Sequence, residues 1–136
     1  MVPKAESFTR RATFMKILIV DDEPLIAQTL SLIFGKNGFV PEIAYSADQG
    51  LAAALKIRPD LVLCDIDMPG RDGIQLMIDL GRELPCVPIL VLTGFYSALD
   101  RVRECATTLS QPVSIVTKPC QPSDLLRAAD QMLRTA

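Results

Sequence analysis

Residues 61–73 of the chain read LVLCDIDMPGRDG, where an apolar run leads directly into two aspartates and a proline-glycine pair. A short run of apolar residues such as 61–64 is typical of a strand that is buried on both faces of a sheet. Asp65 and Asp67 follow this run at once, and no basic side chain stands beside them before Arg71. The stretch therefore predicts an interior strand that brings carboxylates to one edge of a sheet.

Similar apolar runs recur along the chain, and segments with helical periodicity separate them. The predicted strands are residues 16–20, 40–44, 61–64, 89–92 and 113–116. The predicted helices begin at Pro24, after Ser46, after Asp72, before Leu99 and near Ser123, and the fourth extends to Leu109. Gln49 and Gln75 stand where they complete reciprocal N-terminal caps. Strict alternation of five strands with five helices predicts an α/β fold with a parallel sheet between helices.

Composition limits the classes of function. A chain of 136 residues with 49% hydrophobic and 22% charged residues is expected to form one globular domain. Its apolar runs are too short to span a bilayer, and its first residues lack the apolar stretch of a secretion signal. The net charge is −2 and the sequence has no cluster of basic residues, so it does not predict the basic surface that binds nucleic acid. We therefore expect a cytoplasmic protein without direct contacts to nucleic acid or membrane. The four cysteines include no C-x-x-C pair, and we expect them to be reduced thiols.

The chain contains no histidine. This removes the commonest general base and the commonest metal ligand, and it leaves no residue that could carry a phosphohistidine. Any chemistry must therefore use carboxylates, hydroxyl groups and lysine.

Polar side chains follow four of the five predicted strands. They are Asp21 and Asp22 after the first strand, Asp65 after the third, Thr93 after the fourth and Lys118 after the fifth. Ligands of open parallel sheets bind at this end of the strands. Three carboxylates drawn together repel one another unless a cation joins them, and oxygen-only ligands favour Mg²⁺. Each residue also has a simpler explanation, as a helix cap, a strand end or a surface lysine, but these do not explain why all converge on one edge.

Together these motifs resemble the receiver domains of bacterial two-component response regulators, over residues 15–135. The resemblance rests on the acidic pair Asp21-Asp22, Asp65 within LVLCDIDMPGRDG, Thr93, and Lys118-Pro119, in that order. It implies a doubly wound five-stranded parallel sheet in the order 2-1-3-4-5, a flavodoxin-like three-layer sandwich. It also implies a signalling module that is not an enzyme beyond its own phosphorylation and dephosphorylation.

The resemblance implies a role for each site residue. Asp65 would accept a phosphoryl group from a partner histidine kinase or phosphotransfer protein, assisted by Thr93 and Lys118. Asp21, Asp22 and Asp65, with the backbone carbonyl of Asp67, would bind Mg²⁺. The Lys118-Pro119 peptide bond would be cis. The changed surface would then control a downstream protein target.

The sequence departs from the family at several points. Ile115 occupies the switch position, where the family usually has a tyrosine or phenylalanine, so an aromatic rotamer switch is not possible. Residues 107–114, TTLSQPVS, replace a shorter connection before the fifth strand and predict an unusual approach to it. Residues 1–14 have no periodic pattern and are expected to be a disordered tail. Since the sequence ends with the fifth helix, we expect a stand-alone receiver, with a domain of a longer regulator or hybrid kinase as the alternative.

Two other functions stay open at this stage. A pseudo-receiver would use the same fold as an interaction module without being phosphorylated, and Ile115 is compatible with it. A haloacid dehalogenase-type phosphohydrolase would explain the Asp65-Ile66-Asp67 motif. Those enzymes place that motif on their first strand, however, and this chain has it after the third.

Overall fold

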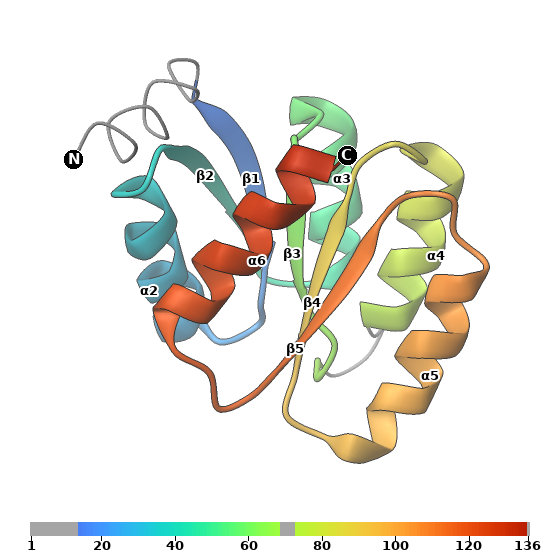
Figure 1. Ribbon diagram of the computed structural model, residues 1–136. Coiled ribbons are helices and arrows are strands. Elements are labelled where there is room, and N and C mark those ends of the chain that lie inside the picture. The colour runs from blue at the N-terminus through green and yellow to red at the C-terminus, as the bar shows by residue number, and fades with distance from the viewer. Residues whose placement is uncertain (1–13, 69–72, 136) are drawn as a thin grey trace.

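The computed structural model describes residues 14–68 and 73–135. Strands and helices alternate along this part of the chain (Figure 1). The strands are β1 (Met15–Val20), β2 (Phe39–Ala44), β3 (Leu61–Asp65), β4 (Ile89–Thr93) and β5 (Val113–Thr117). The helices are α2 (Pro24–Gly35), α3 (Ala47–Ile57), α4 (Gly73–Glu83), α5 (Tyr96–Thr107) and α6 (Pro122–Thr135). Every predicted strand is confirmed, and each is one residue longer at one end than predicted.

The five strands form one parallel sheet in the order β2-β1-β3-β4-β5, as predicted. β2 lies at the edge and pairs with β1 alone, with Pro41 opposite Ile17. Proline has no N–H to donate to a neighbouring strand, so an edge position suits it. β3 lies at the centre between β1 and β4, and all five of its residues are buried. This explains why residues 61–64 are all apolar or small and carry no charge before Asp65.

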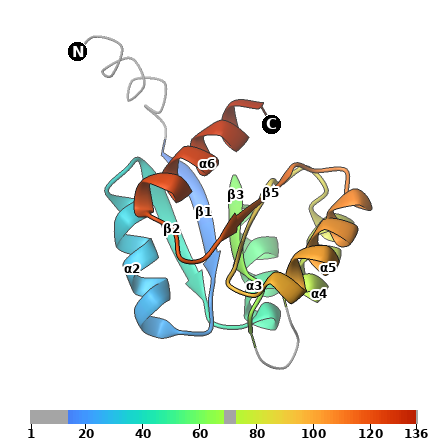
Figure 2. The same ribbon diagram turned by 60° about the horizontal axis from the view of Figure 1, so that its bottom comes forward.

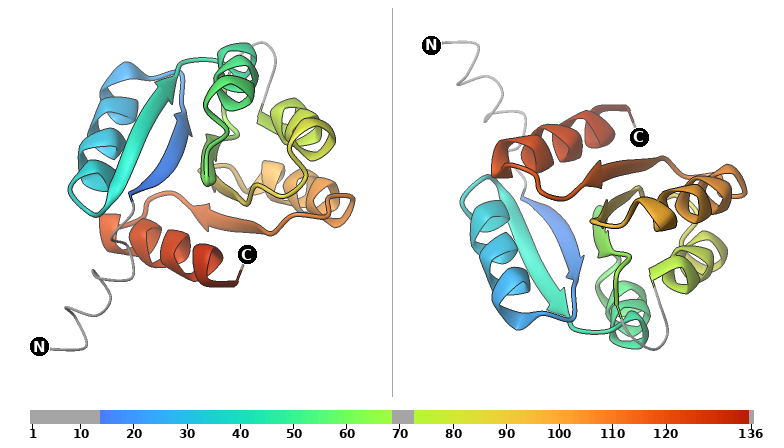
Figure 3. Two further views of the ribbon diagram at one scale, coloured as in Figure 1. Left: turned by 90° about the horizontal axis from the view of Figure 1, so that it is seen from above. Right: turned by 90° about the horizontal axis from the view of Figure 1, so that it is seen from below.

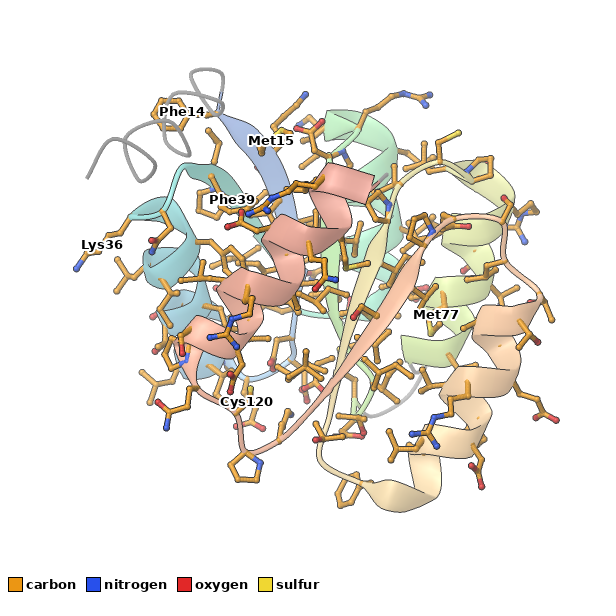
Figure 4. The ribbon with its side chains drawn as sticks, viewed as in Figure 1. Phe14, Met15, Lys36, Phe39, Met77 and Cys120 are labelled. Atoms are coloured by element: carbon orange, nitrogen blue, oxygen red, sulfur yellow. The ribbon has the colours of Figure 1, made fainter. Side chains whose placement is uncertain are left out.

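Helices cover both faces of the sheet, so the molecule has three layers (Figure 3). Alternate residues of β3 face opposite sides: Val62 and Cys64 belong to the core beneath α3, α4 and α5, whereas Leu61 and Leu63 belong to the core beneath α2 and α6. Met77 of α4 is fully buried in the first of these cores (Figure 4). The two apolar layers fix the sheet from both sides and thereby fix the positions of the strand ends.

Local sequence signals explain where α3 begins. The Ser46 hydroxyl oxygen accepts a hydrogen bond from the Gln49 N–H at 3.1 Å, and the Gln49 side-chain oxygen accepts one from the Tyr45 N–H at 2.9 Å. This is the predicted reciprocal cap. The equivalent prediction for α4 involves Asp72, which lies outside the described residues. The predicted tail also lies outside them, except for exposed Phe14.

One predicted helix boundary was wrong. The fourth helix, α5, ends at Thr107 and does not include Leu109. The backbone leaves the helix at Thr108, and the Leu109 side chain packs against Gly81 of α4 at a point where an added Cβ would overlap it. The apolar spacing that suggested a longer helix therefore reflects packing of the following loop on α4, where Leu109 is partly buried.

The carboxyl ends of the strands lie together at one edge of the sheet, which Figure 2 brings toward the reader and the right panel of Figure 3 shows face on. The loops that carry the predicted site residues leave the sheet at this edge. None of the helices in the described part of the chain has the length and apolar composition needed to cross a membrane.

Candidate functional site

Three carboxylates meet at the carboxyl ends of β1 and β3. Asp21, Asp22 and Asp65 each place one oxygen within 4.8 Å of the others' oxygens. Asp21 is 1% exposed and Asp65 is 2% exposed, while Asp22 is partly exposed. Buried carboxylates at such distances repel one another strongly unless positive charge is shared among them. This group therefore has the oxygen ligands, and the need for charge, that suit a hard divalent cation.

Asp21 shows this need most clearly. Its Oδ1 accepts a hydrogen bond from the Glu23 N–H at 2.9 Å, but its buried Oδ2 has no hydrogen-bond partner among the described residues. Burial raises the pKa of Asp21 from 3.8 to about 6; the hydrogen bond from Glu23 opposes this rise, and the charge of Asp65 adds to it. An unpartnered buried oxygen next to two more carboxylates fits a cation ligand, and the donor set fits Mg²⁺.

Asp65 is held in place from two directions. Its Oδ1 accepts hydrogen bonds from the Asp67 N–H at 2.9 Å and from the Lys118 ammonium at 3.3 Å. Lys118 stands 53 residues further along the chain and reaches Asp65 because β5 runs parallel to β3 with β4 between them. Both of these hydrogen bonds are to the same carboxylate oxygen, Oδ1. The basic partner that the sequence lacks beside Asp65 is therefore Lys118.

Asp67 lies at the centre of a second group of contacts. Its Oδ1 accepts a hydrogen bond from the Thr93 hydroxyl at 3.0 Å, and its Oδ2 accepts one from the Gly94 N–H at 2.8 Å. The Lys118 ammonium lies 3.9 Å from Oδ2. From the sequence, only the backbone carbonyl of Asp67 was predicted to belong to the site, and neither its carboxylate nor the Gly94 N–H was predicted. The D-x-D spacing of Asp65 and Asp67 was a visible signal for the Asp67 carboxylate, whereas a backbone N–H group leaves no signal in a sequence.

The structure thus brings together all of the predicted site residues except the switch position. Ile115 lies in the middle of β5, half-buried against the core beneath α3, α4 and α5. The Lys118-Pro119 peptide bond is cis, as predicted. None of the four cysteines, all of which lie in the described residues, forms a disulfide. Burial raises the pKa of the Cys105 and Cys120 thiols, which makes these two less nucleophilic. Cys120 lies in the connection between β5 and α6 (Figure 4).

Comparison with known families agrees with this geometry. The family model of the response regulator receiver domain matches residues 17–130. The chain belongs to this family. Receiver domains are the phosphoacceptor signalling modules of two-component systems, and they interact with histidine kinases and downstream effectors.

Solved receiver structures match over nearly their whole length. A CheY-like receiver domain protein from Methanospirillum hungatei superposes with a TM-score of 0.81 and 28% identity, covering 90% of this chain and 96% of that one. The chemotaxis protein CheY4 of Vibrio cholerae gives a TM-score of 0.78 and 26% identity, covering 88% and 99%. These matches confirm the predicted sheet order and the flavodoxin-like arrangement of the receiver.

Curated relatives are longer than the receiver itself. The DNA-binding response regulator MtrA of Mycolicibacterium smegmatis is 34% identical over 119 residues, covering 88% of this chain and 50% of that protein. A protein-glutamate methylesterase/protein-glutamine glutaminase of Hahella chejuensis is 35% identical over 124 residues, covering 89% and 35%. The chain therefore spans half or less of these two relatives. Neither similarity supports the interpretation as a dehalogenase-type hydrolase or as a pseudo-receiver.

Proposed function

We propose that Asp65 accepts a phosphoryl group from a phosphohistidine of a partner protein. In this step an Asp65 oxygen forms a bond to phosphorus, the bond from phosphorus to the histidine nitrogen breaks, and its electron pair stays on that nitrogen. The product is an acyl phosphate. The observation that carries the proposal is the contact between Asp65 Oδ1 and the Lys118 ammonium, beside the acidic pair. Because Oδ1 already accepts two hydrogen bonds, Oδ2 is the nucleophilic oxygen.

The acidic group supports a role for Mg²⁺ in this reaction. Asp21, Asp22 and Asp65 would hold the ion, and the backbone carbonyl of Asp67 would add a ligand. When bound, the ion neutralises negative charge on the carboxylates and on the transferring group. The buried Oδ2 of Asp21, which has no hydrogen-bond partner within residues 14–68 and 73–135, is the clearest sign that these residues suit a cation.

Lys118 and Thr93 would bind the phosphoryl oxygens. An ammonium attracts them as a point charge, and a hydroxyl donates a directed hydrogen bond. Thr93 is fully buried at the end of β4, and its backbone carbonyl accepts a hydrogen bond from the Lys118 N–H at 2.8 Å. This bond keeps the two donors at a fixed separation, so they can act on one phosphoryl group.

The partners follow from the same chemistry. The donor would be a histidine kinase or phosphotransfer protein, since this chain has no histidine of its own. We infer a receiver unit of residues 15–135 that acts in the cytoplasm and controls a protein target. Its chemistry would be limited to its own phosphorylation and dephosphorylation.

The route from the site to the target would begin at Thr93. Ile115 cannot perform an aromatic rotamer change, because isoleucine is β-branched and stiff at χ1. The Thr93 hydroxyl oxygen accepts a hydrogen bond from the Phe95 N–H at 3.3 Å, and the Phe95 side chain is 62% exposed. A movement of Thr93 toward a phosphoryl group would therefore move an exposed aromatic residue next to it.

The proposal is tested by incubating the chain with acetyl phosphate, with and without Mg²⁺, and measuring intact mass. We expect a Mg²⁺-dependent gain of one phosphoryl group that Asp65→Asn abolishes. Asp60→Asn is the matched control, because Asp60 precedes the opposite end of β3, where its Oδ2 accepts a hydrogen bond from the Lys16 N–H at 2.8 Å. A chain that never gains mass would be a pseudo-receiver, and continuous release of phosphate from organic phosphates would indicate a hydrolase.

A further inference from the structure

The Asp67 carboxylate lies among hydrogen-bond donors next to the proposed phosphorylation site. Only 11% of its surface is exposed, and it lies among donors that come from the ends of two other strands. The Thr93 hydroxyl and the Gly94 N–H donate to its two oxygens at 3.0 and 2.8 Å. The Lys118 ammonium adds a positive charge at 3.9 Å. Each carboxylate oxygen is therefore matched to at least one donor.

These donors belong to the types that bind phosphoryl oxygens. A hydroxyl, a backbone N–H and an ammonium all form strong hydrogen bonds to negatively charged oxygen atoms. Lys118 also donates to Asp65 Oδ1 at 3.3 Å, so the donors surround a point next to the proposed phosphoacceptor. A carboxylate resembles part of a phosphoryl group, since both present negatively charged oxygens that accept hydrogen bonds. One hydroxyl proton cannot serve both acceptors fully at the same time.

We propose that the Asp67 carboxylate is an internal competitor of the phosphoryl group. It binds the Thr93 hydroxyl, the Gly94 N–H and the charge of Lys118 while the Asp65 carboxylate is free, and it releases them when Asp65 carries phosphate. This inference rests on the proposed function of Asp65. Asp67 takes no part in making or breaking bonds to phosphorus, so it is a positioning residue that opposes phosphorylation.

The competition has a measurable cost. Before a phosphoryl group can use the donors, two hydrogen bonds to a carboxylate must break and its charge must move. Removing the carboxylate removes this cost, and about a tenfold gain is the order expected for losing one charge-assisted hydrogen bond. We therefore expect Asp67→Ala to gain phosphate from acetyl phosphate about tenfold faster, and to bind beryllofluoride with Mg²⁺ about tenfold more tightly. Asp67→Asn should gain less, because its amide oxygen can still accept one of the two bonds.

Loss of negative charge alone would also favour an anionic donor, so a charge-matched control is needed. Glu23→Gln removes one negative charge from the same edge of the sheet, and the Glu23 side chain is exposed. We expect less than about a twofold change for Glu23→Gln, because exposed charges are screened by solvent. An equal gain in Glu23→Gln and Asp67→Ala, or no gain in Asp67→Ala, would overturn the inference.

A double-mutant cycle with Thr93→Val separates competition from long-range charge effects. Valine removes the hydroxyl that both acceptors share and keeps the shape of the side chain. If Asp67 acts by occupying donors, the gain from Asp67→Ala should be smaller in the Thr93→Val chain than in the wild type. An identical gain in both backgrounds would mean that Asp67 acts only through its charge.

The Gly94 N–H gives a readout that needs no phosphodonor. In amide NMR spectra, Asp67→Ala should shift the Gly94 signal and speed its hydrogen exchange, while Glu23→Gln should leave it unchanged. An unchanged Gly94 signal would contradict the contact itself. Phosphoryl gain in the wild type at the same rate as in Asp67→Ala would refute only this inference, whereas the absence of an adduct in both chains would refute the proposed function as well.

Discussion

Replacing Asp21 with asparagine tests how much the burial of its charged carboxylate lowers the free energy of unfolding, separately from the proposed role of that carboxylate as a metal ligand. The pKa of Asp21 is about 6 in the folded chain against 3.8 ordinarily, chiefly because the side chain is buried. The two values differ by roughly two pH units, and each unit corresponds to 1.36 kcal/mol, so the full effect is about 3 kcal/mol. A raised pKa means that the folded chain holds the proton more tightly than the unfolded chain.

The sign of the pH dependence follows from this. Below a pH of about 3.8 the Asp21 carboxyl group is protonated in both states, and its contribution to stability is complete. As the pH rises from there through about 6, the unfolded chain loses the proton first, so the free energy of unfolding falls. Near pH 7.5 the whole contribution of about 3 kcal/mol is lost in the absence of Mg²⁺.

Asparagine carries no charge at any of these pH values. Its side-chain oxygen can keep the hydrogen bond that the Glu23 N–H donates at 2.9 Å. We therefore expect Asp21→Asn to be more stable than the wild type at pH 7.5 without Mg²⁺, by up to about 3 kcal/mol, and to show no loss of stability between pH 4 and 6 from this position. Added Mg²⁺ should stabilise the wild type more than the variant, because the variant lacks one of the proposed ligands.

The measurement is urea unfolding followed by far-ultraviolet circular dichroism at a series of pH values, first with a chelator and then with Mg²⁺. Circular dichroism is suitable because the chain contains no tryptophan. Glu23→Gln is the control, since that exposed side chain should leave the pH profile unchanged. Parallel pH profiles for the wild type and Asp21→Asn would show that burial of Asp21 does not carry the cost assigned to it.

Two further predictions concern the supports of the site. Ser46→Ala should lower the free energy of unfolding by about 1 kcal/mol, because it removes the acceptor of the Gln49 N–H at the start of α3. Urea unfolding measures this change, and an unchanged free energy would show that the cap does not stabilise the fold. Gly73→Ala should cost about 1–3 kcal/mol and slow phosphoryl gain from acetyl phosphate, because an added Cβ would lie 2.8 Å from the Asp65 carbonyl oxygen. Gly81→Ala in the same helix is its control, since that Cβ would overlap only the flexible end of Leu109. Equal losses in both variants would contradict the argument.

Most of the fold could be predicted from the sequence because its signals are local. Apolar runs mark strands that are buried on both faces, and the reciprocal contacts of Ser46 and Gln49 mark the start of a helix. Pro41 marks an edge strand, because it cannot donate to a second neighbour. The end of α5 could not be predicted in the same way. Leu109 continues the helical spacing but packs on Gly81, and a contact between distant segments leaves no local pattern.

The same distinction applies to the site. The acidic pair, Asp65 and Lys118 could be predicted because the family places them at fixed strand ends, and parallel strands bring those ends together. The carboxylate of Asp67 was underestimated because its role depends on the direction in which it points. Its two acceptors meet the Thr93 hydroxyl and the Gly94 N–H only in the folded loop, and a backbone N–H has no residue type to reveal it.

The distribution of charge divides the site into two parts that differ in what they lack. Asp21, Asp22 and Asp65 form an acidic part that includes a buried oxygen without a hydrogen-bond partner in the described residues, which suits a cation. Thr93, Gly94 and Lys118 form a donor part, in which Thr93 and Gly94 donate to Asp67 and the Lys118 ammonium lies 3.9 Å from it. Asp65 belongs to both, since one of its oxygens accepts from Lys118 and it also contributes to the acidic group. On the proposals made above, a cation would satisfy the first part alone, whereas the second part would change only when a phosphoryl group on Asp65 competes with Asp67 for its donors.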